Sequence, residues 1–175
     1  MYDKVEDYER YKIFANRHDP GIKWQLDLRP VLESVTFDVV DHGIEKLMKG
    51  DKLKKFYKHK GDDSIRDEIR FMSDYIAWRD VPHFPRAFWD AKTQVRRTCN
   101  FTIEQVPFDY KMSKGEKVVF AFRDYDEVNM YAAWIWDLDK IKIPHQGGKG
   151  GSGEPFYLIP IRTLTPLYEF VEKKF

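Results

Sequence analysis

Two short segments rich in aromatic residues constrain the fold of this chain more than any other feature of its sequence. They span residues 71–78 (FMSDYIAW) and 86–93 (RAFWDAKT). Aromatic residues are enriched in strands. The stretch between the two segments contains Asp80, Pro82 and Pro85, which are typical of a turn. We therefore predict two neighbouring strands, with a hairpin as the simplest connection.

Three charged residues in these segments are the candidates for chemistry. Side chains along a strand alternate between its two faces, so Asp90 and Lys92 emerge together on one face. Trp89 and Ala91 point to the other face, where a core is the natural destination. Asp74 has apolar neighbours, and a carboxylate is costly in such a setting unless it meets a cation or hydrogen-bond donors.

If the two strands pair, Asp74 and Asp90 can converge at one edge of the sheet. Their oxygen ligands suit Mg²⁺ or Mn²⁺ rather than structural zinc. A cation held there lowers the pKa of a bound water and neutralises charge on a phosphate, while Lys92 can position that water or hold the phosphate. The alternative is a surface salt bridge between Asp90 and Lys92, with Asp74 capping a turn. The aromatic residues of both segments argue against such exposure.

The motif formed by Ser73-Asp74, fifteen further residues and Asp90-Ala91-Lys92 resembles the PD-(D/E)-x-K nuclease superfamily. That superfamily includes restriction endonucleases and Holliday junction resolvases. The resemblance covers about residues 65–143, and Ser73 stands where the family has proline. It implies a central mixed sheet flanked by helices and Mg²⁺- or Mn²⁺-dependent hydrolysis of phosphodiester bonds. It also implies metal ligation by Asp74 and Asp90, with Lys92 as the catalytic lysine.

The resemblance suggests further site residues. Many family members add an acidic metal ligand from a helix before the first motif strand, and Glu68 is the nearest candidate, with Glu45 and Asp67 as competitors. Some members use a polar residue two positions beyond the lysine, where Gln94 stands. Cations that follow the motif are expected to contact the phosphates flanking the cut, although each alone is more often a solvated charge. They are Arg96, Arg97, Lys111, Lys114 and Lys117.

The length of 175 residues fits one domain with its own core, so we treat residues 1–175 as a single domain. Apolar residues at helical spacing, including Val40 and Ile44, predict a mainly helical part over residues 1–60. The glycine-rich stretch 147–153 is expected to be a flexible loop. The chain is therefore predicted to belong to the α/β class, with a helical N-terminal region.

Further elements are expected beyond the motif. A strand pair is predicted over residues 117–123 and 130–136, joined by a polar turn. Residues 103–114 between the two strand pairs are predicted to form a short helix or an irregular crossover. A short strand over 156–161 and a final helix over 166–173 complete the predicted elements.

Composition excludes several other classes of protein. Lys and Arg (30) nearly cancel Asp and Glu (29), so any attraction to phosphate must be local. A single cysteine, Cys99, cannot form an internal disulfide or a thiolate-rich zinc site. No apolar run approaches the roughly 20 residues that span a bilayer. These features lead us to expect a protein of the reducing cytoplasm without a membrane partner.

The sequence thus predicts a Mg²⁺-dependent deoxyribonuclease with nucleic acid as its partner. DNA is favoured over RNA by family resemblance alone, and an endonuclease is favoured over an exonuclease. One alternative is a catalytically inactive module that keeps the scaffold and binds nucleic acid or a protein. A weaker one is an inhibitor or assembly protein. Cutting both strands of a duplex would suit a homodimer, and the sequence leaves the oligomeric state open.

Overall fold

Two sheets organise the part of the chain that the computed structural model describes, which is residues 20–43, 71–79, 86–94, 96–147 and 153–174. The larger sheet has six strands in the order β1-β2-β3-β5-β6-β9, and the smaller has three in the order β4-β8-β7. The six are β1 (Asp38–Asp41), β2 (Tyr75–Trp78), β3 (Ala87–Thr93), β5 (Val118–Arg123), β6 (Met130–Trp134) and β9 (Thr165–Pro166). The three are β4 (Asn100–Glu104), β7 (Ile143–His145) and β8 (Phe156–Pro160).

The larger sheet is mixed, as predicted. β2 and β3 pair antiparallel with Tyr75 opposite Trp89, which is the hairpin-like pairing expected from the two aromatic segments. β3 and β5 are parallel, with Asp90 opposite Phe120. The chain passes between these parallel strands through β4 and helix α5 (Gln105–Ser113). All residues of β5 are buried, as expected for a central strand covered on both faces.

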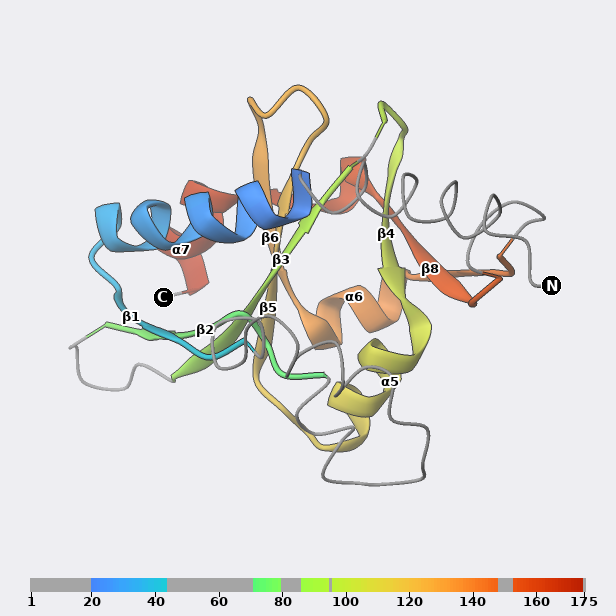
Figure 1. Cartoon of the computed structure of the whole chain (residues 1–175), viewed down its shortest axis with the longest axis horizontal. Helices are drawn as coiled ribbons and strands as arrows, with labels where there is room; N and C mark the ends of the chain where they lie inside the picture. Colours follow the sequence, from blue (N-terminus) through green and yellow to red (C-terminus); the bar gives the residue numbers. More distant parts are fainter. Residues whose placement is uncertain (1–19, 44–70, 80–85, 95, 148–152, 175) are drawn as a thin grey trace, which may run out of the picture.

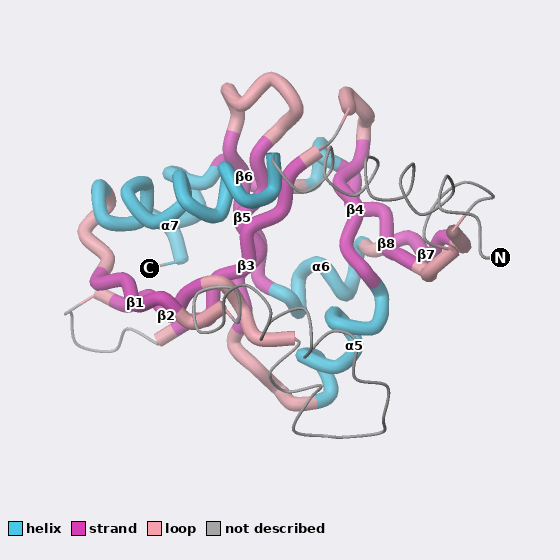
Figure 2. Tube along the Cα trace, in the orientation of Figure 1, coloured by secondary structure: helices cyan, strands magenta, loops and turns pink. Residues whose placement is uncertain are grey.

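Each face of the larger sheet carries its own core (Figure 1). The helix of residues 20–34 and helix α7 (Leu167–Lys174) cover one face, and α5 and α6 (Ile135–Ile141) lie on the other side with the smaller sheet, as the trace in Figure 2 also shows. The first core includes Trp24, Leu28, Leu32, Trp89, Ala91 and Phe170. The second includes Phe101, Phe108, Phe120, Phe122 and Leu138.

The alternation along β3 follows from these two cores. Trp89 and Ala91 belong to the core under the helix of residues 20–34, as predicted. Phe88 packs against the core on the opposite face. Because alternate residues share a face, Asp90 and Lys92 point to the same side as Phe88, toward α5. The site therefore lies where the charged side of β3 meets the crossover helix.

The N-terminal part departs from the helical prediction. Residues 20–34 are helical, but residues 38–41 form β1, which pairs antiparallel with β2. The expectation that Val40 lies on a helix is wrong, because backbone pairing with β2 and burial of Val39 stabilise an extended strand there. The predicted residues 44–60, Glu45 and Ile44 among them, lie outside the described residues.

Other boundaries also shifted. The strand predicted over 130–136 ends at Trp134, where α6 begins, and β4 occupies the start of the predicted crossover. The strand predicted over 156–161 and the helix over 166–173 are confirmed as β8 and α7, with a 3₁₀ turn (Ile161–Thr163) following β8. Residues 148–152 of the glycine-rich stretch lie outside the described part. Among described residues, no helix has the length and apolar character needed to cross a membrane.

Candidate active site

Asp74 and Asp90 lie side by side, as the pairing of their strands predicts. Asp74 directly precedes β2, Asp90 is in the middle of β3, and each is 6% exposed. The backbone N–H of Ala91 donates to Asp74 Oδ2 at 2.7 Å. The backbone N–H of Asp74 in turn donates to the carboxylate of Asp90. Each carboxylate thus accepts a backbone N–H from the neighbouring segment, which fixes the pair where the start of β2 meets β3.

Lys111 completes this cluster from helix α5, which packs on the side of β3 that carries Asp90. Its side chain is 2% exposed, and its Nζ lies 2.7 Å from Asp90 Oδ2 and 2.7 Å from Ser73 Oγ. The prediction that Lys111 contacts phosphate is wrong, because its ammonium is buried and bonded within the protein. Ser73 stands where the family motif has proline, and its hydroxyl supplies a contact to Lys111 that proline cannot make.

The three charges give the two carboxyl groups different pKa values. Burial, followed by the charge of Asp90, raises the pKa of Asp74 to about 7, against the opposing effects of Lys92, the Ala91 N–H and Lys111. Burial also acts to raise the pKa of Asp90, but Lys111 and then Lys92 outweigh it, so the pKa of Asp90 lies below its ordinary value. Asp90 is therefore an ionised, paired carboxylate, and Asp74 is the carboxyl group short of positive charge.

The shortage of positive charge at Asp74 is what a bound divalent cation would correct. A cation near Asp74 would stabilise its ionised form, which burial and Asp90 disfavour. Carboxylate oxygens are the ligands that Mg²⁺ and Mn²⁺ prefer. Within the described ranges, no group of three or more His, Cys, Asp or Glu side chains could hold a metal ion. Glu68 and its competitors Glu45 and Asp67, expected as a third acidic ligand, lie outside those ranges.

Lys92 is close to both carboxyl groups. It is half-buried on the same side of β3 as Asp90, and its charge lowers the pKa of Asp74 and of Asp90. The neighbour of Lys92 in β5 is Phe122, so an apolar side chain lies beside the lysine. The predicted grouping of two carboxyl groups and one lysine is thus present, while their roles in catalysis stay a prediction.

Gln94 lies away from this chemistry. It is 8% exposed, and its amide nitrogen donates to Thr98 O, Thr98 Oγ1 and Asn100 O, each at 3.0 Å. Its Oε1 accepts from the backbone N–H of Tyr125 at 3.3 Å. Both polar atoms of the amide therefore tie the loop after β3 to the turn between β5 and β6. These contacts are structural, and the catalytic role of Gln94 remains a prediction that no contact supports.

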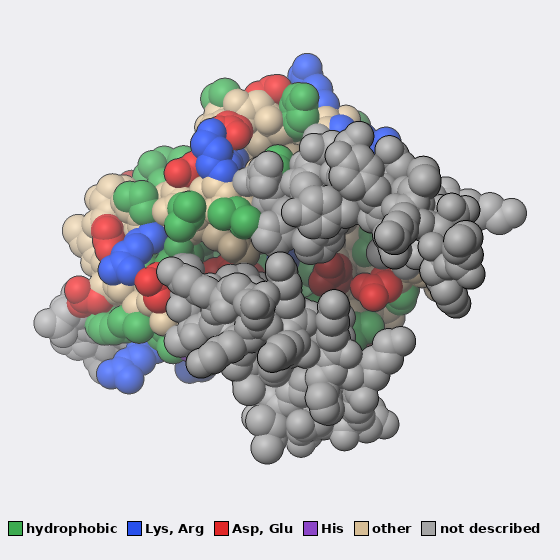
Figure 3. All heavy atoms as spheres, viewed as in Figure 1, with side chains coloured by type: hydrophobic (Ala, Val, Ile, Leu, Met, Phe, Trp, Pro, Cys, Tyr) green, Lys and Arg blue, Asp and Glu red, His purple; other side chains and the backbone are tan. Residues whose placement is uncertain are grey.

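The remaining predicted cations lie at the surface. Arg96, Arg97, Lys114 and Lys117 are exposed, and Lys114 Nζ is 5.4 Å from the ring centroid of Tyr110. On the face drawn in Figure 3, Lys and Arg side chains are interspersed with Asp and Glu over the described part. This mixing agrees with the nearly equal numbers of basic and acidic residues. Any binding of phosphate would therefore come from a few cations near the site.

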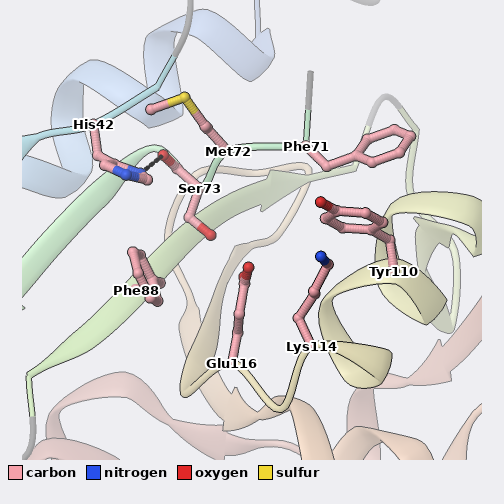
Figure 4. A pocket seen from close by; sticks show the side chains of 8 residues that line it. All are labelled: His42, Phe71, Met72, Ser73, Phe88, Tyr110, Lys114 and Glu116. Carbon is pink, nitrogen blue, oxygen red and sulfur yellow. Dashed lines mark hydrogen bonds between the residues drawn. The ribbon is translucent and has the colours of Figure 1, made fainter. Parts of the chain in front are cut away.

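A pocket of about 360 Å³ lies between β3, α5 and the residues before β2, and Figure 4 shows the side chains that line it. Ser73, which precedes Asp74, is one of its walls. Another is Phe88, two residues before Asp90 on β3. Burial, more than any other influence, raises the pKa of the pocket residue Glu116, and Asp90 adds to this rise. The full lining is His42, Phe71, Met72, Ser73, Phe88, Tyr110, Lys114 and Glu116.

Sequence reasoning missed the burial of Lys111 and the existence of this pocket. One signal for Lys111 was present, because Phe108 precedes it by three residues and residues at that spacing share a helix face. Phe108 and Lys111 are the buried residues of α5. No comparable signal marks the pocket, because its walls come from β3, α5 and segments distant in sequence.

The pKa of Asp74 predicts how stability depends on pH. Its value in the folded protein, about 7, exceeds the ordinary 3.8, so the contribution of Asp74 is complete below 3.8 and is lost as the pH rises through 7. In EDTA, the free energy of unfolding should therefore fall between about pH 5 and pH 8 more steeply in the wild type than in Asp74→Asn. Urea titrations at the two pH values measure this, and equal slopes would contradict the raised pKa.

Comparisons with known proteins bear on the fold. No protein-family model matches this sequence, and no curated protein matches it. Among solved structures, a nuclease from a fusselovirus is similar, with a TM-score of 0.44 and 14% identity over 98% of this chain and 93% of that one. A Holliday junction resolvase from Archaeoglobus fulgidus has a TM-score of 0.51 and 10% identity over 89% of this chain and 98% of that one.

The likeness to the resolvase shows the fold of this chain. It is a mixed α/β fold like that of this resolvase, as the resemblance in the sequence implied. Asp90 and Lys92 lie on β3, and Asp74 directly precedes β2.

Proposed function

We propose that this chain is a metal-dependent nuclease that hydrolyses phosphodiester bonds in DNA. The observation that supports this most is the buried Asp74–Asp90 pair, which combines one carboxylate neutralised by Lys111 with one carboxyl group that still lacks a counter-charge. Lys92 faces the same space. Buried carboxyl groups with perturbed pKa values on a nuclease fold are a functional-site pattern with a physical basis.

Each residue has a distinct role in this proposal. A bound divalent cation would supply a water of lowered pKa and neutralise charge growing on the phosphate. Asp74 and Asp90 hold the cation. Lys111 keeps Asp90 ionised and fixed in direction through its 2.7 Å contact. The ammonium of Lys92 donates to the attacking water or to a phosphate oxygen, where a fixed positive charge favours the transition state.

The substrate and the mode of cleavage are proposed from the resemblance of the sequence motif to the nuclease superfamily. We propose DNA rather than RNA as the substrate and internal cleavage as the mode, with Arg96, Arg97 and Lys114 contacting phosphates near the cut. A homodimer would place two such sites on opposite strands of a duplex.

Metal removal and a Lys92→Ala variant test the function together. Nicking of a supercoiled plasmid should stop in EDTA and resume with Mg²⁺ or Mn²⁺. Lys92→Ala should reduce the rate by at least about 100-fold with metal present, because a preorganised charge aimed at the reacting group contributes that much. Lys140→Ala, at an exposed lysine of α6, is the matched control and should cut normally. Cleavage that continues in EDTA would exclude the proposed chemistry.

One observation favours a second candidate, an inactive module that binds nucleic acid. The Lys111 ammonium already occupies one oxygen of Asp90, so the protein itself supplies part of the positive charge that a metal would bring. Under this alternative, DNA binding survives in EDTA and no cleavage follows on adding Mg²⁺ or Mn²⁺. The same plasmid assay, run beside a binding assay, distinguishes the two functions.

A further inference from the structure

The pocket beside the carboxylate pair has aromatic walls. Phe88 lies on one side and Phe71 and Tyr110 on the other, with the two rings of Phe71 and Tyr110 in contact at a centroid distance of 5.3 Å (Figure 4). Phe88 is two residues before Asp90 and points to the same side of β3. The pocket is therefore next to the position where a phosphate would meet the carboxylate pair.

Polar groups also line this mainly apolar pocket. The Tyr110 hydroxyl is buried, and within the described part of the chain it has no hydrogen-bond partner. Figure 4 shows this hydroxyl directed into the same space as the carboxylate of Glu116 and the hydroxyl of Ser73. A buried hydroxyl without a partner is costly and uncommon. Its presence here indicates that a bound group completes its hydrogen bonding.

The aromatic walls and the polar groups of the pocket indicate which chemical group of a nucleic acid it can bind. A phosphate inside the pocket is disfavoured by the carboxylate of Glu116, while the exposed Lys114 can contact the phosphate of the adjoining nucleotide. A purely apolar group would leave Tyr110 and Glu116 without partners. A nucleobase is flat, is uncharged and carries hydrogen-bond donors at its edge, so it can stack on the aromatic walls and donate to Glu116.

We propose that this pocket binds an unpaired nucleobase of the DNA strand, adjacent to the phosphate that is cut. This inference rests on the proposed function. A base inside a regular duplex is stacked and paired, so reaching the pocket would require unstacking, which costs least for a base that is already unpaired. The chain should therefore prefer DNA with an unpaired nucleotide over a continuous duplex.

Fluorescence anisotropy in EDTA measures this preference without cleavage. The two probes are a labelled duplex with a one-nucleotide bulge and a fully paired duplex of the same length. We expect the wild type to bind the bulged duplex at least about fivefold more tightly, the low end of what one base–aromatic stack contributes. Phe88→Leu keeps apolar volume but removes the aromatic face, and it should lose most of this preference.

Two further variants make the test specific. Tyr110→Phe keeps the ring and removes the buried hydroxyl, so it should retain stacking and lose part of the preference. Tyr168→Leu changes an exposed ring on α7, which covers the other face of the sheet, and it should behave as the wild type. All variants should bind the paired duplex equally.

The outcomes separate this inference from the function on which it rests. Equal affinity of the wild type for both probes would overturn the pocket assignment, even if metal-dependent cleavage is found. A preference that is unchanged in both Phe88→Leu and Tyr110→Phe would overturn it as well, since the preference would then arise elsewhere. Failure to bind either probe would overturn the pocket assignment, while the plasmid assay with metal tests the nuclease proposal separately.

Discussion

An Asp90→Ala variant is expected to cut DNA at least about 100-fold more slowly than the wild type and to unfold about 3–5 kcal/mol more easily. The loss of activity follows from removing one of the two carboxylates proposed to hold the cation. The loss of stability follows from Lys111, whose buried ammonium would keep only Ser73 Oγ as a partner. Plasmid nicking rates and urea denaturation measure the two effects.

Matched variants separate these two effects of Asp90. Asp90→Asn keeps an oxygen that can accept from Lys111, so it should lose as much activity and less stability. Asp137→Ala removes the acidic partner from an exposed lysine–aspartate pair, Lys140 with Asp137 at 3.1 Å, and should change stability by no more than about 1 kcal/mol. Full cleavage by Asp90→Ala would rule out its role in the site.

The second large effect is expected for Lys111→Met. Methionine fills the space of the lysine stem, but the carboxylate of Asp90 would then be buried without its closest cation. The pKa of Asp90 should rise, and the free energy of unfolding should fall by about 3–5 kcal/mol at neutral pH. Lys140→Met, at the surface pair, is the matched control, because its side chain is 71% exposed.

Added Mn²⁺ should restore part of the stability lost in Lys111→Met, because a divalent cation can supply the charge that the ammonium provided. The double variant Asp90→Ala/Lys111→Met should be less destabilised than the sum of the two single variants, by about 1–3 kcal/mol. Additive losses in urea denaturation would mean that the two side chains do not stabilise one another, contrary to their 2.7 Å contact.

The central hairpin-like pairing could be predicted from sequence because its determinants are local. The alternation Phe88, Trp89, Asp90 requires only that a strand has two faces, and the prolines between the segments mark a turn. Once β2 and β3 pair, Asp74 and Asp90 become neighbours. The fold class followed from the motif resemblance and is confirmed.

The burial of Lys111 could not be predicted from the sequence. Lysine side chains are almost always exposed, so the sequence predicts a solvated charge at position 111. Its burial depends on where α5 lies relative to β3, which is set by the packing of Phe108 into the second core. β1 was missed for a related reason, because a short edge strand is stabilised by its partner β2 rather than by its own residues.

The binding of Mn²⁺, followed by electron paramagnetic resonance at about pH 8, tests the central claim most directly. Asp74 loses its proton as the pH rises through about 7, so both carboxylates should be available for the ion at this pH. Wild-type protein should then bind Mn²⁺, and Asp74→Asn, folded as judged by its denaturation curve, should bind it at least about tenfold more weakly. Equal binding by the two proteins, or none by the wild type, would contradict a metal centre at this pair.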